Sequence, residues 1–163
     1  MISKLDHLIV AVKDLNEAEK NYKKLFGIHP VWRGEHKELG TTNVIFNLKN
    51  TYLELLSAKG DGLGAMLVNN AIEENGDGLM GVVFGVDGIE EVSKSLLEKG
   101  FAITDISDGE GQNNDSKELR KWKNFFLPPE LSRGIFSFII EHTEGSLRKL
   151  DEYSSDSINK LDH

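Results

Sequence analysis

The chain has 163 residues and a net charge of −8, from 27 acidic and 19 basic side chains, so it lacks the basic excess that a nucleic-acid partner favours. It contains no cysteine, which excludes disulfides, zinc thiolate sites and a cysteine nucleophile. No apolar run approaches the ~20 residues of a membrane span and no signal peptide is evident, so a cytoplasmic location without membrane contact is the default expectation.

The first part of the chain predicts a strand, a helix and three further strands. Residues 4–12 are short, apolar and rich in β-branched side chains, which is typical of a buried strand. Asp14 stands at an N-cap position with Glu17 three residues later, and Gly27 suits the left-handed position that ends a helix. Three strands are then predicted, near 30–33, over 41–48 and over 51–57.

The second part of the chain repeats this order after a flexible glycine-rich link. The predicted elements are a connecting helix over 65–74, a strand over 79–86, a helix from 89 to Gly100, and strands over 101–106, 119–127 and 135–142. The polar, glycine-rich stretch 109–115 predicts a mobile loop. The tail, 146–161, is polar and weakly helical, and we expect a surface appendage or a partly disordered end.

An internal repeat is the most informative feature of the sequence. A shift of 74 positions lays Val12 on Val86 and Leu15 on Ile89, and each copy runs from a strand into a helix that ends in glycine. We therefore predict an α+β fold built from two βαβββ units. The predicted organisation is a domain over 1–145, with units at about 4–58 and 79–143 and a linker over 59–78, followed by a C-terminal helical tail over 146–163.

Three stretches of the sequence resemble one known superfamily. The run Leu5-Asp6-His7-Leu8-Ile9, the segments 40–43 and 52–56, and the closing stretch 136–142 resemble the glyoxalase / bleomycin-resistance / dioxygenase (vicinal oxygen chelate) superfamily, and within it the glyoxalase-like domain subgroup. The resemblance covers about residues 4–143. It implies that the two units pair into a curved mixed sheet around a pocket. It also implies a divalent metal (Zn²⁺, Ni²⁺, Fe²⁺ or Mn²⁺) held by the first and fourth strands of each unit, acting as a Lewis acid on a carbonyl or vicinal-dioxygen compound.

Carried over residue by residue, the resemblance assigns His7 and Glu54 as metal ligands of the first unit, with Glu54 also the candidate catalytic residue. The matching positions of the second unit hold Gly81 and Phe138, which cannot bind a metal. Strand alternation can bring His142 to the pocket, which would complete a His7–Glu54–His142 set of two imidazoles and one carboxylate. The alternative interpretation is that His7 and Glu54 form a hydrogen-bonded pair without a metal.

Three further residues are candidates for substrate binding. Asn43 can face the pocket as a hydrogen-bond donor, or it can satisfy a turn. Arg120 and Trp122 can hold an anionic or aromatic ligand, or they can belong to a solvated strand face. His29 and His36 lie by a proline and among charges, and we expect both at the surface.

Two hypotheses for the function follow. The first is a glyoxalase-like enzyme of lyase, isomerase or dioxygenase type that acts on a small carbonyl or vicinal-dioxygen compound. The second is a metal-free protein that binds or sequesters a small apolar or aromatic molecule, as the bleomycin-resistance branch does, and the missing second-unit ligands favour it. The resemblance also implies a homodimer, and in both hypotheses the partner is a small molecule.

Overall fold

The computed structural model describes residues 2–149 and 153–161, and these contain eight strands, three α-helices and one 3₁₀ turn. The strands are β1 (Ile2–Ala11), β2 (Trp32–His36), β3 (Thr41–Asn47), β4 (Tyr52–Ala58), β5 (Gly78–Val86), β6 (Ser107–Asn113), β7 (Leu119–Phe126) and β8 (Phe136–Glu144). The helices are α1 (Leu15–Phe26), α2 (Leu63–Asn75), α3 (Ile89–Glu98) and the turn η1 (Pro129–Ser132). None of the described helices combines the length and the apolar character needed to cross a bilayer.

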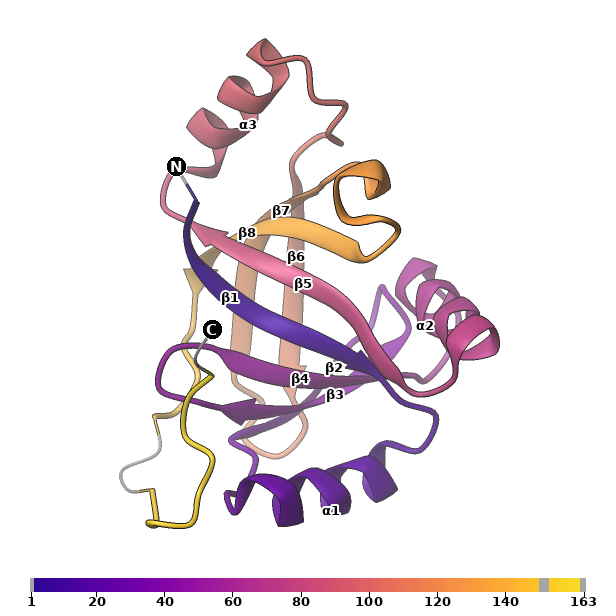
Figure 1. Cartoon of the computed structure of the whole chain (residues 1–163), viewed down its shortest axis with the longest axis vertical. Coiled ribbons are helices and arrows are strands. Elements are labelled where there is room, and N and C mark those ends of the chain that lie inside the picture. Colours follow the sequence, from indigo (N-terminus) through magenta and orange to yellow (C-terminus); the bar gives the residue numbers. More distant parts are fainter. Residues whose placement is uncertain (1, 150–152, 162–163) are drawn as a thin grey trace.

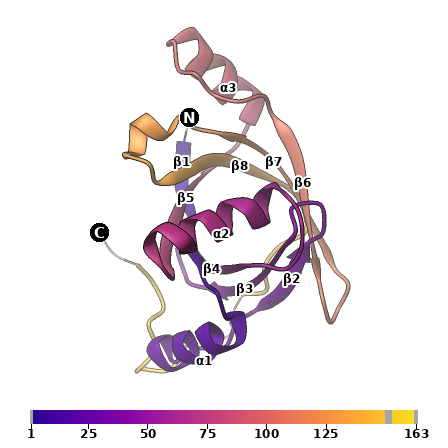
Figure 2. The same ribbon diagram turned by 90° about the vertical axis from the view of Figure 1, so that its right-hand side faces the viewer.

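The strands close into one barrel in the order β1-β4-β3-β2-β6-β7-β8-β5. Each unit contributes four consecutive places in this order, and the units meet at two antiparallel seams, β1 with β5 and β2 with β6. Helices α1 and α3 lie at opposite ends of the molecule, and α2 lies beside the barrel (Figures 1 and 2). This confirms the predicted α+β fold of two βαβββ units that form a curved mixed sheet.

The register of the sheet reproduces the sequence repeat. Across the seam between the units, Ile9 pairs with Gly81 and His7 pairs with Val83. A shift of 74 positions exchanges these two pairs, so an approximate two-fold axis passes between them. Within the units, Ile9 pairs with Glu54 and Val83 pairs with Phe138, both between parallel strands. Gly81 and Phe138 are therefore the structural counterparts of His7 and Glu54, as the repeat predicted.

Local signals in the sequence fix the first helix. The Asp14 carboxylate accepts a hydrogen bond from the Glu17 backbone N–H at 2.9 Å, and Gly27 ends the helix with a φ of 66°. The apolar face of α1 covers the barrel, where Phe26 packs edge-on against the fully buried Phe46, with ring centroids 5.7 Å apart. Helix α3 covers a similar apolar cluster under β7 and β8. The two helices thus cover the outer face of the sheet, one over each unit, and leave its concave face free.

The glycine-rich stretch 109–115 is not the loop that its composition predicts, and the strand predicted over 101–106 is irregular. Strand β6 instead runs over 107–113 and pairs with β7. Gly109 lies opposite Trp122, and a side chain at Gly109 would collide with the indole ring. A Cβ at Gly111 would lie 3.1 Å from the His36 ring. These glycines make room for large aromatic rings on the neighbouring strands. Because glycine has no side chain, the strand lacks the usual alternation of apolar and polar residues.

The C-terminal tail is also different from its prediction, because its described residues, 146–149 and 153–161, contain no helix. The tail runs back along the first unit beside α1 (Figure 1). The Ile158 N–H donates to the Phe26 carbonyl at 2.9 Å, and the Lys49 N–H donates to the Asn159 carbonyl at 2.8 Å. Tyr153 packs on the core cluster under α1. Backbone groups that a helix would use internally here bind the first unit.

Candidate functional site

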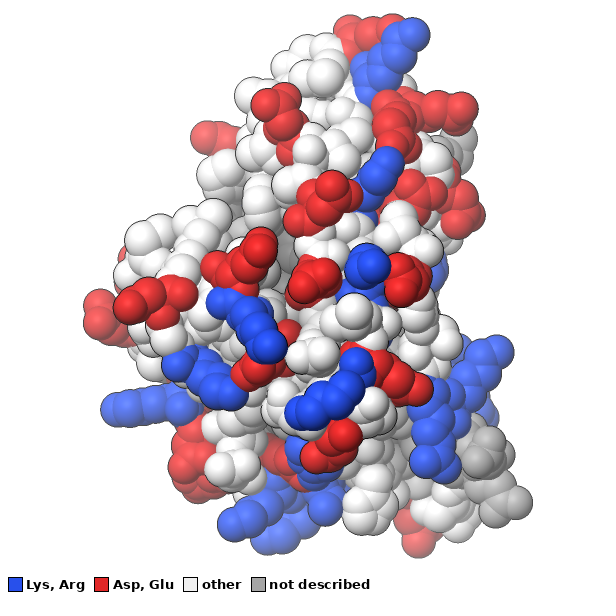
Figure 3. Space-filling model, turned by 180° about the vertical axis from the view of Figure 1, so that it is seen from behind, with Lys and Arg blue, Asp and Glu red and all other residues white. Residues whose placement is uncertain are grey.

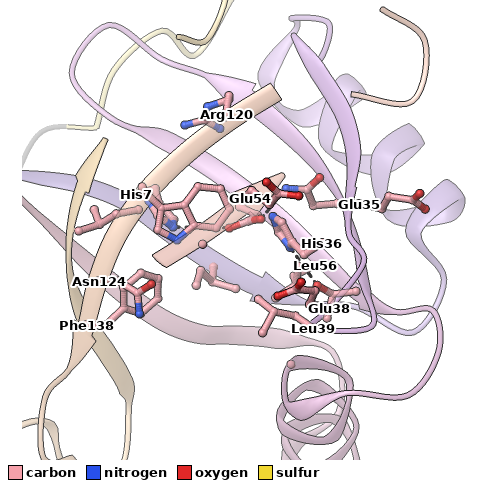
Figure 4. A pocket seen from close by; sticks show the side chains of 18 of the residues that line it. His7, Glu35, His36, Glu38, Leu39, Glu54, Leu56, Arg120, Asn124 and Phe138 are labelled. Carbon is pink, nitrogen blue, oxygen red and sulfur yellow. Dashed lines mark hydrogen bonds and ion pairs between the residues drawn. The ribbon is translucent and has the colours of Figure 1, made fainter. Parts of the chain in front are cut away.

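The barrel encloses a cavity of about 530 Å³, a volume typical of small-molecule sites. Side chains from both units line it, and Figure 4 shows the polar group at its centre. From the first unit come His7, His36, Asn43, Tyr52 and Glu54; from the second come Arg120, Trp122, Phe126, Phe136, Phe138 and His142. The cavity therefore contains every residue that the sequence proposed for a site.

Glu54 and His7 meet inside this cavity. The His7 Nε2 atom lies 3.5 Å from the Glu54 Oε2 atom, and the two side chains are 3% and 9% exposed. Asn43 does not satisfy a turn, since its amide donates to the other carboxylate oxygen, Oε1, at 2.6 Å. Its own carbonyl oxygen is buried and has no hydrogen-bond partner among the described residues. Asn43 thus orients Glu54 and leaves Oε2 available.

A β-bulge brings a second carboxylate to the same imidazole. Leu5 pairs with Phe84 and His7 pairs with Val83, so Asp6 is the extra residue on β1 and turns inward. Its Oδ1 atom lies 2.8 Å from His7 Nδ1 and 3.0 Å from His142 Nε2. The sequence did not reveal Asp6, because regular alternation would place it on the opposite face from His7.

The charge of Asp6 fixes the orientation of both imidazoles. Burial alone would raise its pKa, but hydrogen bonds from His142 and His7 together hold the pKa well below the ordinary value. An ionised carboxylate only accepts hydrogen bonds, so His7 Nδ1 and His142 Nε2 both donate. His7 therefore turns Nε2 toward Glu54, where the contact is attractive when a proton or a cation lies between the two atoms. Tyr52 stacks on the His7 ring at 4.3 Å and holds its plane.

Arg120 is a buried cation in the wall of the cavity, and it does not lie on a solvated strand face. It is 7% exposed, and its guanidinium carbon lies 5.6 Å from the Trp32 ring and 5.5 Å from the Tyr52 ring. Among the described residues no carboxylate lies within ion-pair distance of it, and its Nε has no hydrogen-bond partner. Buried charges are usually paired, so this guanidinium fits an anion bound from solution.

His36 also lines the cavity, although the sequence placed it at the surface. Its Nδ1 atom lies 2.9 Å from the Thr41 hydroxyl, and its ring meets Trp122 edge-on at 5.6 Å. Burial lowers the pKa of His36, the nearby Arg120 and His7 lower it further, and Glu54 opposes the shift. The alternation of Trp32, Gly34 and His36 toward one face was a signal for this position, but neighbouring charges hid it.

The second unit contributes an apolar wall. The rings of Phe126, Phe136 and Phe138 lie 5.4 to 5.7 Å from one another, and Phe138 meets the His7 ring edge-on at 6.0 Å. Gly81 leaves the space that the Phe136 ring occupies, since a Cβ there would lie 3.2 Å from that ring. Where the first unit has a histidine and a glutamate, the second unit has an aromatic surface.

The divalent metal that the resemblance implies finds only part of its ligand set here. His7 Nε2 and Glu54 Oε2 are spaced as two ligands about 2.1 Å from one cation can be. His142, however, turns its Nε2 to Asp6, and the residues of the described ranges include no group of three or more metal-binding side chains. The expected His7–Glu54–His142 set does not converge on one point. Two protein ligands hold a metal only weakly, so the residues described do not fit the metal that the resemblance implies.

Comparison with known proteins agrees with this architecture. The model of the family described as "Glyoxalase-like domain" matches residues 5–161. The chain belongs to this family. The chain also takes the same fold as methylmalonyl-CoA epimerase from Mycobacterium tuberculosis, with a TM-score of 0.70 and 16% identity over 88% of this chain and 90% of that one. A variant of the Streptomyces coelicolor epimerase, in complex with 2-nitronate-propionyl-CoA, gives a TM-score of 0.67 and 19% identity over 86% and 95%.

A relative matched by sequence is the mitochondrial methylmalonyl-CoA epimerase of Dictyostelium discoideum, 34% identical over 108 residues. The match covers 64% of this glyoxalase-like chain and 61% of the Dictyostelium protein, so about two fifths of that relative lies outside it. These findings confirm the superfamily resemblance that the sequence indicated. The Dictyostelium relative is an epimerase by name, which is a kind of isomerase.

Proposed function

We propose that this protein is an isomerase-type enzyme that moves a proton at a carbon next to a carbonyl group, in a small substrate that carries a carboxylate. The observation that carries the proposal is the coexistence of Glu54 and Arg120 in one cavity without an ion pair between them. A free base and a free anion site, both buried, are what such a reaction requires. The epimerase relatives support the same class of reaction.

Glu54 is the proposed base. Asn43 holds its Oε1 atom, so Oε2 can take the proton from the substrate carbon while the electron pair of that C–H bond moves into the carbonyl to form an enolate. Return of the proton from Glu54 restores the same face of the carbon. Inversion requires a proton from the opposite face, which a water molecule in the cavity would donate, and the hydroxide that forms would then take the proton from Glu54. Arg120 binds the substrate carboxylate, and its positive charge also stabilises the enolate. Glu54 and Arg120 are 7% exposed each, and burial strengthens both interactions.

Solvent exchange tests this proposal directly. The methylmalonyl thioester of N-acetylcysteamine carries one carboxylate and one hydrogen between two carbonyl carbons. In D₂O we expect the protein to exchange this hydrogen for deuterium, with Glu54→Gln reducing the rate at least about 100-fold. Glu98→Gln is the matched control, because Glu98 is exposed, lies outside the cavity and forms an ion pair with the likewise exposed Lys94. Exchange that is equally fast in Glu54→Gln and in the unchanged protein rules out Glu54 as the base.

A second candidate function rests on the second unit. With Gly81 and Phe138 in place of ligands, the cavity has the aromatic wall of a protein that binds an apolar molecule without turning it over. This function predicts that ligand binding raises the melting temperature equally with and without EDTA, and that Glu54→Gln binds the same ligand unchanged. Loss of catalysed exchange in the Glu54→Gln variant decides for the enzyme.

A further inference from the structure

The apolar wall, the buried arginine and the charges at the cavity mouth together restrict the ligand. Arg120 and Phe138 lie on opposite sides of His7 (Figure 4). A molecule that spans the centre of the site therefore meets one cation at one end and three phenylalanine rings at the other. Such a molecule has a single anionic group and an apolar body.

The mouth of the cavity carries an excess of acidic residues. The charged residues that border it outside the central group are Glu35, Lys37, Glu38, Asp108 and Glu110. Four of these five are acidic, and on the face shown in Figure 3 acidic and basic side chains are interspersed around a hollow. A polyphosphate group at this mouth would meet repulsion where binding needs attraction.

Lysines offset this excess only in part, because Lys59 neutralises Glu35. Lys121 and Lys123 are instead paired with acids outside the set that borders the mouth. Lys59 contacts Glu35 at 2.5 Å, Lys121 contacts Glu144 at 2.8 Å and Lys123 contacts Glu90 at 2.5 Å. Phosphates of a large ligand would have to break these pairs to recruit the lysines. The single buried cation, Arg120, lies deep in the cavity and serves one anionic group.

We infer that the substrate is a compact acid with one anionic group and an apolar, aromatic-compatible body, and that acyl-CoA thioesters are excluded. This inference rests on the proposed function for its site, but it concerns binding and not proton transfer. It separates the chain from the epimerase relatives, whose names specify CoA thioesters. The carboxylate binds Arg120, and the body packs on Phe126, Phe136 and Phe138.

Calorimetry with matched probes tests the inference. Phenylglyoxylate has one carboxylate and a phenyl ring, and its methyl ester has the same ring without the charge. Phenylacetyl-CoA also lacks a free carboxylate and adds the phosphates, so it is compared with the ester. We expect phenylglyoxylate to bind at least about tenfold more tightly than its ester, the difference a charged hydrogen bond supplies. We expect phenylacetyl-CoA to bind at least about tenfold more weakly than the ester.

Variants assign these differences to residues. Arg120→Met should remove the preference for phenylglyoxylate over its ester, and Arg120→Lys, which keeps the charge, should retain part of it. The double variant Glu38→Lys/Glu110→Lys changes only exposed side chains and should raise the affinity for phenylacetyl-CoA at least about tenfold. Circular dichroism confirms that each variant is folded.

Several outcomes overturn the inference: phenylglyoxylate does not bind at millimolar concentration, it binds no better than its ester, or phenylacetyl-CoA binds as tightly as the ester. Failure of the proposed function looks different. In that case phenylglyoxylate binds as expected through Arg120, yet no deuterium exchange depends on Glu54. If exchange depends on Glu54 but occurs best with a CoA thioester, the proposed function stands and this inference falls.

Discussion

The two βαβββ units have the same fold and opposite chemistry. At equivalent places on β1 and β5 stand His7 and Gly81, and at equivalent places on β4 and β8 stand Glu54 and Phe138. The first unit directs a polar pair into the cavity, and the second fills the same depth with aromatic rings. The same backbone thus carries a polar half and an apolar half. A small ligand with one polar end and one apolar end can bind between them in a single orientation.

The largest expected effect comes from restoring the two metal ligands that the second unit lacks. The triple variant Gly81→His/Phe138→Glu/Phe136→Ala places a histidine and a glutamate opposite His7 and Glu54, and the alanine clears the space that the Phe136 ring occupies. Four ligands replace two, so we expect Zn²⁺ affinity to increase at least about 1,000-fold. Calorimetry in the presence of a competing chelator measures it. A variant that folds but binds zinc no better contradicts the equivalence of the two pairs.

Asp6 joins the units, since it binds His7 of the first and His142 of the second. Asp6→Ala leaves both imidazoles without their acceptor inside the protein, and we expect a loss of about 3 kcal/mol in the free energy of unfolding at pH 7. Denaturant titration measures this loss, with the exposed Asp105→Ala as the control.

The stabilisation that Asp6 provides should depend on pH. Its pKa is lowered in the folded protein, so its stabilisation is complete above the ordinary carboxyl value of 3.8 and is lost as the pH falls below it. The difference between the unchanged protein and Asp6→Ala should therefore narrow in acid. A difference that stays constant down to the acid transition contradicts the ionised carboxylate.

Arg120 of the second unit is expected to lower stability while it provides anion binding. Removing a buried cation that has no carboxylate partner in the part of the chain that the structure describes relieves a desolvation penalty of several kcal/mol. Against this stand cation–π contacts worth about 0.5–2 kcal/mol each with Trp32 and Tyr52, and a hydrogen bond with Tyr52. We expect Arg120→Met to be about 1 kcal/mol more stable than the unchanged protein by thermal unfolding, while it loses anion binding. A clear loss of stability would mean that the two ring contacts outweigh the desolvation.

The fold could be predicted from the sequence because both units repeat a strand followed by a helix, and the parallel pairs β1–β4 and β5–β8 have equivalent registers, Ile9 with Glu54 and Val83 with Phe138. His7 and Glu54 were proposed from the resemblance to the superfamily, and both line the cavity. Strand β6 was missed because its glycine content is typical of a loop. The reason for Gly109 is the Trp122 ring on the neighbouring strand, which leaves no room for a side chain there. Asp6 was missed because one bulge reverses its face, and bulges leave no pattern in a single sequence.

The smallest expected effect concerns His36, at the seam between the units. Its ring on β2 fills the space that Gly111 on β6 leaves open. Its pKa is lowered in the folded protein, so the unfolded chain takes up a proton first as the pH falls below 6.5. The free energy of unfolding must then decrease on acidification, by at most about 1.4 kcal/mol per pH unit for one group.

Replacing this group should flatten that decrease. His36→Asn keeps a polar atom near the Thr41 hydroxyl and cannot titrate, so we expect a smaller loss of stability between pH 7 and pH 5.5 than in the unchanged protein. The exposed His29→Asn is the control and should leave the slope as it was. An unchanged slope in His36→Asn would mean that the imidazole stays as accessible to protons as in the unfolded chain, and that the first unit's side of the cavity is wetter than its packing against Trp122 implies.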